Sequence, residues 1–360
     1  DLVVVAALVG LRYGLVVVGR EWTGIQRPTV VIDLRLAALP KYMLLSIVRA
    51  GVAYLISISL TFTLAYWAAK DALAERILVP LLDILQSVPI LAFLPPVVIA
   101  LVAIFPRSNI GLELSAAILL VTCQAWNMIF SFYQSLKTVP PDLQELANTY
   151  QLSWYQKLRW IELPYATPGL MWNSMVSVAN GWFFLMLAES FNGSNHFRLP
   201  GLGSYMQTAV EQGNNTAKWS ATLAMLALVV VLDRLLWQPI MAWSQGFQMD
   251  EHVRPERPKS WVLNLMRRSR LLRWLEQFRA DRLLKRIPRP KVAPLKPEHR
   301  RRASSLAVTG LLFLLVALLA VAGLKLVSIL RLVDGSEWLR LLKSGGASMG
   351  RVLASTLMAT

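Results

Sequence analysis

The sequence predicts an all-α, polytopic helical membrane protein, and three observations support this fold class. Hydrophobic residues make up 55% of the 360 residues, only 16% are charged, and the mean hydropathy is +0.48, values far from those of a soluble globular chain. Several apolar runs are long enough to cross the bilayer core, which takes about 20 helical residues. None of these runs alternates polar and apolar residues with a period of two, so helices are the expected spanning elements.

The chain is expected to contain eight apolar spans, the last of which is cut off. They lie near residues 1–19, 42–68, 80–104, 112–133, 166–190, 217–240 and 305–331, with the eighth beginning near residue 346. The sequence starts at Asp1 without a methionine and stops at Thr360 inside the last apolar run. We therefore expect it to be part of a longer polypeptide.

Cysteine and histidine are too scarce to form a site. The lone Cys123 lies inside an apolar run and is expected to pack as an apolar side chain. The three histidines, His196, His252 and His299, all lie in expected loops. An integral-membrane enzyme would need a cluster of His, Asp or Glu at the bilayer edge, so we predict no catalytic residues and no metal ligands.

A basic segment at residues 251–302 indicates the orientation of the chain. It holds 17 Lys and Arg against 5 Asp and Glu, a net charge of +12 out of +16 for the whole chain. The positive-inside rule places this segment in the cytoplasm, and counting spans backwards places the N-terminus and residues 134–165 there as well. An amphipathic linker lying on anionic lipid is a better interpretation than a nucleic-acid site.

The polar stretch between the spans at 112–133 and 166–190 predicts two short helices that form a rigid cytoplasmic knob over residues 138–165. Pro140 and Pro141 suit the first turn of a helix, where their missing N–H groups are not needed. Ser153 and Gln156 have the spacing of a capping box, so a second helix is expected to start at Trp154. Four apolar side chains are expected to be buried in the knob: Leu143, Leu146, Leu158 and Ile161. Two prolines are expected to close the loop and start the next span: Pro164 and Pro168.

This stretch resembles the coupling loop of ATP-binding-cassette (ABC) importer permeases, whose pattern is E-A-A, three residues, Gly, nine residues and I-x-L-P. The matching positions are Glu145, Ala147, Ile161, Leu163 and Pro164. Leu146 replaces the second Ala, and Gln151 stands where the family has Gly. The resemblance implies the type I ABC importer transmembrane fold, with the matching residues and Gln151 in an ATPase-coupling loop. Because the family glycine lies at a corner that often needs a left-handed backbone, Gln151 implies either a different corner geometry or weaker coupling.

Other stretches narrow the resemblance to the duplicated permease component of anion-type importers, relatives of nitrate, sulfonate, taurine and bicarbonate permeases. They read DILQSVPILAFLPP, TCQAWNMIFSFYQSLKTVP, WNSMVSVANGWFF and LPGLGSY. The resemblance implies a first permease unit at 1–250, the basic cytoplasmic linker at 251–302 and the start of a second unit at 303–360. An offset near 302 residues aligns Ser46 and Arg49 with Ser348 and Arg351, which suggests an internal repeat.

In such importers the permease performs no covalent chemistry. A separate ATPase dimer uses ATP and Mg, and this chain contains no G-x-x-x-x-G-K-[ST] phosphate-binding loop. The resemblance therefore implies a multi-pass protein of the bacterial plasma (inner) membrane with no cofactor of its own. Its expected partners are the ATPase dimer, an extracytoplasmic solute-binding protein and membrane lipid, and no nucleic acid is expected. The expectation that the solute is an anion rests mainly on the resemblance.

Polar side chains inside the expected spans are candidates for a translocation path, because such groups are costly in lipid. The candidates are Gln124, Asn127, Asn173, Ser177, Asn180 and Glu189. Small and polar residues at these spacings also occur where membrane helices pack together, and for any single residue packing is the favoured interpretation.

Two other classes of membrane protein compete with the importer. A secondary transporter or channel would also have many spans, an internal repeat and interior polar residues, but it would not need the cytoplasmic knob. A membrane scaffold would depend on the basic linker and would tolerate changes in the knob.

Overall fold

The computed structural model describes residues 32–105, 108–190, 199–247 and 335–359, together with the isolated residues 12, 16, 19 and 20. Its elements over these ranges are all helices, in agreement with the predicted fold class. Contacts divide the chain into two units, Asp1–Glu298 and His299–Thr360, and each is described by itself. The expected first span, the basic linker and the span at 305–331 lie outside the continuous described ranges.

Four helical segments of the described residues are long and apolar enough to cross a membrane. They are Leu36–Lys70, Ile110–Lys137, Trp154–Ser190 and Asn215–Phe247. These segments correspond to the spans expected at 42–68, 112–133, 166–190 and 217–240. The chain is therefore a multi-pass membrane protein.

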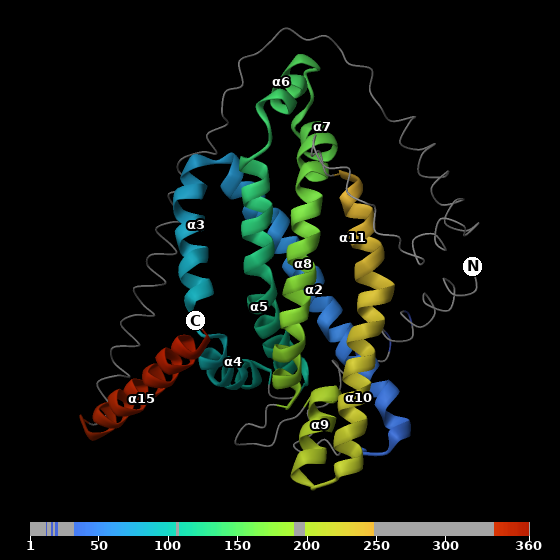
Figure 1. Cartoon of the computed structure of the whole chain (residues 1–360), viewed down its shortest axis with the longest axis vertical. Helices are drawn as coiled ribbons and strands as arrows, with labels where there is room; N and C mark the ends of the chain where they lie inside the picture. Colours follow the sequence, from blue (N-terminus) through green and yellow to red (C-terminus); the bar gives the residue numbers. More distant parts are fainter. Residues whose placement is uncertain are drawn as a thin grey trace. The chain divides into compact units, whose positions relative to one another are not determined.

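Three long helices form the centre of the first unit. They are α2 (Leu39–Lys70), α5 (Ile110–Lys137) and α8 (Leu163–Ser190), and α5 packs along both of the others. In Figure 1, α2 and α5 end at the end of the bundle that carries the short helices α6 and α7, and α8 begins at this same end. We call this the knob end. The other end of the bundle, where α2 and α5 begin, is called the opposite end.

The prediction of one continuous spanning helix at 80–104 is wrong. The structure has two helices there, α3 (Ala72–Ser87) and α4 (Ile90–Ile104), with 16 and 15 residues. The break lies at Val88 and Pro89, where Val88 has extended backbone angles because a residue before proline avoids the helical region. Figure 1 shows α3 beside α5, and α4 turned across the opposite end of the bundle.

The last helices of the first unit return the chain to the knob end. A short helix, α9 (Leu202–Glu211), lies at the opposite end and packs against α8 and α10 (Asn215–Leu232). A π-helical turn, η3 (Asp233–Trp237), joins α10 to α11 (Gln238–Ser244). Two short 3₁₀ segments complete the unit: η1 (Leu36–Ala38) and η4 (Gln245–Phe247).

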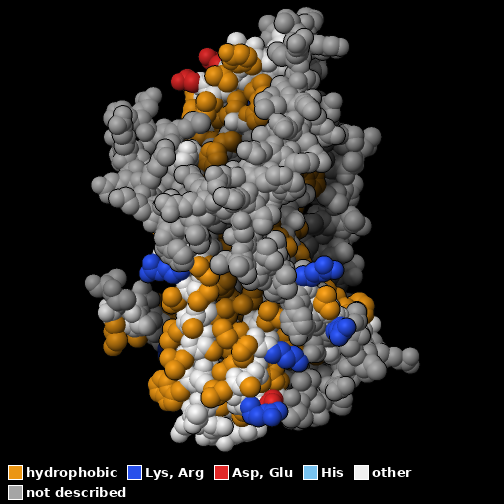
Figure 2. All heavy atoms as spheres, turned by 90° about the vertical axis from the view of Figure 1, so that its right-hand side faces the viewer, with side chains coloured by type: hydrophobic (Ala, Val, Ile, Leu, Met, Phe, Trp, Pro, Cys, Tyr) orange, Lys and Arg blue, Asp and Glu red, His pale blue; other side chains and the backbone are white. Residues whose placement is uncertain are grey.

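The outer surface of α10 is apolar although little of it is buried. Only 11% of the most apolar stretch of Asn215–Phe247 is buried inside the protein, and exposed side chains include Trp219, Leu223 and Leu226. Hydrophobic side chains also cover much of the lower part of the face seen in Figure 2. An apolar helix face of this kind is suited to lipid contact.

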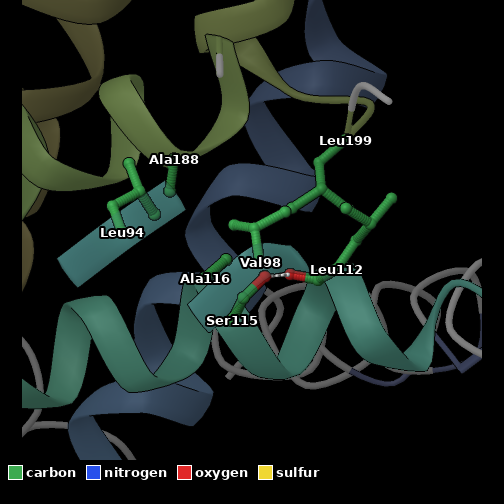
Figure 3. A pocket seen from close by; sticks show the side chains of 7 residues that line it. All are labelled: Leu94, Val98, Leu112, Ser115, Ala116, Ala188 and Leu199. Atoms are coloured by element: carbon green, nitrogen blue, oxygen red, sulfur yellow. Dashed lines mark hydrogen bonds between the residues drawn. The ribbon is translucent and has the colours of Figure 1, made fainter. Parts of the chain in front are cut away.

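The tight packing of α4 leaves little space at the opposite end. A cavity of about 10 Å³ lies between α4, α5, α8 and Leu199, as Figure 3 shows. Its one polar wall residue, Ser115, donates its hydroxyl hydrogen to the Leu112 carbonyl oxygen at 2.8 Å. A space this small holds about one water molecule, so it is not a solute site.

The described part of the second unit is one helix, α15 (Gly335–Ala359). It starts before residue 346, where an apolar run was expected to begin, and it is not among the described helices apolar enough to span a membrane. Both Ser348 and Arg351 lie on it and are exposed.

Candidate functional site

The first half of the knob is helix α6 (Pro141–Thr149), which begins where the two prolines predict. Beyond its end, Gln151 has a φ of 49° and is the single described non-glycine residue with a positive φ. The Leu152 N–H donates to the Ala147 carbonyl oxygen at 2.9 Å, and the Gln151 N–H donates to that of Asn148 at 3.0 Å. This is a Schellman-type helix ending, whose left-handed position usually holds glycine. Of the two alternatives for Gln151, a different corner geometry is therefore excluded.

The second half of the knob begins as predicted but continues differently. Ser153 and Gln156 form the expected capping box, and α7 covers Trp154–Lys157. Instead of ending before Pro164, the helix runs on through a π-helical turn, η2 (Leu158–Glu162), directly into α8. Proline lacks an N–H, and its ring clashes with the carbonyl four residues earlier in an ordinary α-helix, so a wider turn before it allows the helix to continue. The predicted helix, corner and second helix are confirmed, but the second helix is continuous with the next span, so the prediction that Pro164 and Pro168 close the loop is wrong.

A small apolar core holds the knob together. Val139, Ala147 and Ile161 are buried in it, and three partly buried side chains pack against them: Leu143, Leu152 and Tyr165. The Tyr165 hydroxyl also donates to the Thr138 carbonyl oxygen at 3.0 Å, which ties the base of the knob to the end of α5. The two halves of the knob are thus fixed relative to each other.

Two of the four side chains expected in the knob core lie elsewhere. Leu158 packs against the main helix bundle, and Leu146 is 46% exposed because it lies on the face of α6 that turns away from the core. Leu146 instead shares the surface of the knob with four exposed aromatic side chains: Tyr150, Trp154, Tyr155 and Trp160. Figure 2 shows hydrophobic and acidic side chains together at the knob end. Exposed apolar surface of this kind is suited to contact with another protein or with lipid.

The six predicted coupling residues therefore have different positions. Ala147 and Ile161 are buried in the knob core, and Leu163 and Pro164 are partly buried where α8 begins. Glu145 and Gln151 are exposed on the knob surface.

At the opposite end, an ionic cluster of Ser46, Arg49, Glu113 and Glu189 joins α2, α5 and α8. Arg49 binds Glu113 with two parallel hydrogen bonds of 2.6 and 2.7 Å, and its third nitrogen pairs with Glu189. The Ser46 hydroxyl lies 2.8 and 2.9 Å from the two carboxylate oxygens of Glu189. All four side chains are at most 2% exposed.

The LPGLGSY stretch closes this cluster. The Gly203 N–H donates to Glu189 at 2.8 Å, and the Leu202 N–H donates to the Ser46 hydroxyl oxygen at 2.9 Å. A Cβ at Gly201 would overlap the Glu189 carboxylate, and one at Gly203 would lie 2.8 Å from the Glu189 Cβ. Both positions thus need glycine so that the backbone can approach the carboxylate.

Sequence reasoning placed Glu189 among the path candidates and missed its partners. Arg49 and Glu189 are 140 residues apart, and the structure pairs them in a buried site that lines neither of the two grooves described below. One signal was available: a charged residue inside an apolar span needs a partner of opposite charge, and three expected spans each carry such a residue near the same end. The guanidinium of Arg49 is occupied by two carboxylates, so it cannot bind a solute anion.

A polar groove of about 420 Å³ lies along α5, bordered by α3 and α8. Its lining residues are Gln86, Asn127, Phe130, Ser131, Gln134, Ser135, Thr138 and Asn173. Of the path candidates, Asn127 and Asn173 lie in this groove. The structure brings these two together, although they are on different helices.

The remaining path candidates do not line the groove. Gln124 is buried between helices, where its Oε1 accepts a 3.4 Å hydrogen bond from Ser57, and a Cβ at Gly181 would lie 2.6 Å from its Nε2. Ser177 is fully buried, and its hydroxyl has no described hydrogen-bond partner. Asn180 is exposed on α8 outside the groove lining. The packing interpretation therefore fits Gln124 best.

Comparison with known families identifies the central part of the chain. Residues 61–236, from the middle of α2 to η3, match the model of the family described as binding-protein-dependent transport system inner membrane component. These residues belong to that ABC permease family. The match includes the knob, the polar groove and two of the three charged residues of the ionic cluster.

Individual relatives of the chain are transport permeases and not enzymes. A putative aliphatic sulfonates transport permease protein of Bacillus subtilis (strain 168) is 25% identical over 212 residues, 58% of this chain and 71% of the relative. A glycine betaine transport system permease protein of the same organism is 26% identical over 196 residues, 54% of this chain and 64% of the relative. A nitrate import permease protein of Leptolyngbya laminosa is 26% identical over 172 residues, 48% of this chain and 57% of the relative.

Proposed function

We propose that this chain is the permease subunit of an ABC importer and that the knob at residues 138–165 couples it to a separate ATPase dimer. The observation that carries the proposal is the surface of the knob. A self-supporting unit with its own core presents one leucine and four aromatic side chains to solvent on top of the transmembrane bundle. Rigid apolar anchors of this kind are the residues that contribute most to protein–protein binding.

The proposed partners are the subunits that hydrolyse ATP and deliver the solute in importers of this family. The ATPase subunits bind and hydrolyse ATP with Mg, and a solute-binding protein delivers the solute at the opposite end, near α9. With the ATPase at the knob end, the knob, the N-terminus and the basic segment at 251–302 lie in the cytoplasm of a bacterium, and the chain spans the plasma membrane. The basic segment then lies on anionic lipid.

A small oxyanion is the solute that we propose. The relatives named for aliphatic sulfonates and for nitrate support this class. The relative named for glycine betaine, which is a zwitterion, makes betaine the alternative solute.

We also propose that α15 begins a second permease unit after residue 302. Ser348 and Arg351 on α15 have the same three-residue spacing as Ser46 and Arg49 on α2, which are both members of the ionic cluster. The alignment thus pairs residues that have a specific structural role in the first unit. A first unit at 1–250 and a linker at 251–302 agree with this arrangement.

Co-purification of the full-length protein with its ATPase tests the coupling role. Glu145→Arg and Trp154→Ala, both on the knob surface, are expected to reduce the amount of ATPase retained about tenfold or more, because each removes a surface contact of the knob. The control is Trp219→Ala on α10, where the side chain is 69% exposed but far from the knob in sequence. Normal ATPase retention by both knob variants, or solute transport without any ATPase, would favour a secondary transporter or channel instead.

A further inference from the structure

Two open grooves of equal volume, about 420 Å³ each, differ in chemistry. The groove on α2 is lined by Val52, Leu55, Ile56, Ser59, Leu60 and Thr63. The hydroxyls of Ser59 and Thr63 donate to carbonyl oxygens of their own helix at 2.7 and 2.8 Å, so hydrocarbon can fill this groove at no cost in hydrogen bonds. In the groove on α5, all lining residues except Phe130 are polar.

Several hydrogen-bond donors in the groove on α5 are already used within the protein. The Gln86 amide donates to Asp83 at 2.6 Å, and the Asn173 amide donates to Ser131 and to the Gly169 carbonyl oxygen at 3.1 and 3.0 Å. Two hydroxyls donate to carbonyl oxygens of α5, those of Ser135 and Thr138, at 2.8 and 3.0 Å. These groups stabilise the groove, and apart from the second N–H of the Gln86 amide they have no donor left for a solute.

Three donors in the same groove are not used by any described group. The side-chain amides of Asn127 and Gln134 make no hydrogen bond within the described residues, and the Ser131 hydroxyl accepts one without donating. These residues follow one face of α5 at intervals of four and three positions. With a rise of 1.5 Å per residue, they lie about 6 Å and 4.5 Å apart along the helix axis.

We propose that the groove on α5 is a passage for a small oxyanion, which moves along the donors of Asn127, Ser131 and Gln134. The proposal rests on the importer function and on the proposed oxyanion solute, and it adds the residues of the passage. The oxygens of a sulfonate or nitrate only accept hydrogen bonds, and the groove offers donors at successive positions. No charged side chain lines the groove, so the anion is bound weakly enough to leave again.

The same lining is poorly suited to the alternative solute. A quaternary ammonium group, as in glycine betaine, is recognised by several aromatic faces or by negative charge. The groove contains one aromatic ring, that of Phe130, and no lining carboxylate. A competing explanation is that a second permease chain covers this polar face and bonds to its amides.

Cysteine labelling in the full transporter, with any cysteine outside these 360 residues replaced first, distinguishes these possibilities, because the 360-residue sequence holds the single Cys123, which is buried. In a Cys123→Ala background, single variants Asn127→Cys and Gln134→Cys are reconstituted with the ATPase in lipid nanodiscs. Two methanethiosulfonate reagents are compared, one carrying a sulfonate group and one a trimethylammonium group. The labelling rate of each cysteine is divided by the rate at which the same reagent reacts with a free thiol in solution, so that the intrinsic reactivities of the two reagents cancel. The control Ser59→Cys lies in the apolar groove.

The proposal predicts that both groove cysteines react and that the sulfonate reagent reacts about three- to tenfold faster than the ammonium reagent, the factor that one hydrogen bond supplies. The Ser59→Cys control is expected to react with neither reagent. Unreactive groove cysteines would mean that protein covers the face, and faster reaction with the ammonium reagent would mean a cation-selective groove. Either result would overturn the proposal.

ATPase retention by the same preparations separates this inference from the proposed function. If the ATPase is retained and its hydrolysis is normal, but the groove cysteines do not react, the passage is misplaced while the importer function stands. If no ATPase binds to the protein even in the Cys123→Ala background or in the wild type, the importer function itself fails.

Discussion

Arg49 and Lys70 lie on the same helix, α2, and each pairs with a buried glutamate, but the two pairs differ in how completely they are satisfied. Arg49 and its two glutamates are at most 2% exposed, and the Gly203 N–H and the Ser46 hydroxyl complete the hydrogen bonds of Glu189. At the knob end, Lys70 is 38% exposed and bonds one oxygen of Glu162, whose other oxygen has no described partner. Glu162 is also the last residue of the π-helical turn beneath the knob.

We infer from this difference that the opposite end of the bundle is held more firmly than the knob end. The ionic cluster holds α2, α5, α8 and the start of α9 together through several bonds that must break at once. At the knob end the Lys70–Glu162 pair joins α2 to η2, a helical irregularity of the type found at functional sites, and a partly exposed pair, Lys137–Glu75, joins α5 to α3. We therefore expect movements driven by the ATPase to be largest at the knob end.

The largest effect is expected from Arg49→Leu. It leaves Glu113 and Glu189 buried without a positive partner, and breaking a buried ion pair in this way costs about 3–5 kcal/mol. The unfolding temperature of the purified protein in detergent should fall sharply, or the protein should not accumulate. The control Arg35→Leu removes a guanidinium whose side chain is 85% exposed and should have little effect. Equal stability of the two variants would show that the cluster does not hold the helices together.

A smaller loss is expected from Gly203→Ala. The added Cβ would meet the Met186 carbonyl oxygen and the Glu189 side chain, and overpacking of this kind costs about 1–3 kcal/mol. The matched control is Gly51→Ala in α2, where a Cβ meets no atom within 4 Å. Thermal unfolding should separate the two, and a stable Gly203→Ala protein would argue against the close approach of LPGLGSY to Glu189.

Lys70→Met is expected to lower the free energy of unfolding less than Arg49→Leu does. Solvent reaches the Lys70 site, so water can partly replace the lysine as a partner of Glu162. We expect a loss of about 1–2 kcal/mol, reduced from the value for fully buried pairs, and less solute moved per ATP hydrolysed. The charge exchange Lys70→Glu with Glu162→Lys should restore part of the lost stability and part of the solute transport per ATP hydrolysed. The control Lys137→Met breaks the partly exposed pair with Glu75. If this control changes coupling as much as Lys70→Met does, the pair with Glu162 has no special role.

The smallest effect is expected from Gln151→Gly, in the direction of greater stability. At a φ of 49°, glycine avoids the Cβ strain that costs other residues about 1 kcal/mol. The control Asn148→Gly places glycine inside α6 and should destabilise the knob by a similar amount. Hydrogen exchange of residues 141–157 measures both changes. A clear loss of ATPase binding in Gln151→Gly would contradict a purely conformational role for this residue.

Features determined by neighbouring residues could be predicted from the sequence. The capping box of Ser153 and the start of α6 at the prolines each depend on a few adjacent residues, whereas the sequence leaves the corner geometry at Gln151 open between two alternatives. The four long spans could be predicted because length and apolarity decide them. The fold class could be predicted for the same reason, whereas the permease family is predicted from the resemblance of the coupling-loop residues and of the other matching stretches.

Features that depend on distant contacts could not be predicted. The break at Val88 and Pro89 looks like part of one apolar run, because periodicity does not show whether a helix continues through a proline. The π-helical turn before Pro164 lets one helix continue where the same residue type suggested an end. The partners of Glu189 come from α2, α5 and the segment after α8, so only the folded structure brings them together.

Hydrogen exchange of the full transporter, compared with and without its ATPase, tests the account most directly. We predict that ATPase binding protects the backbone of α6 and α7 at the knob end and leaves α9, at the opposite end, unchanged. Bound ATPase without protection of the knob, or equal protection of α9, would contradict the coupling role of the knob and the fixed character of the opposite end.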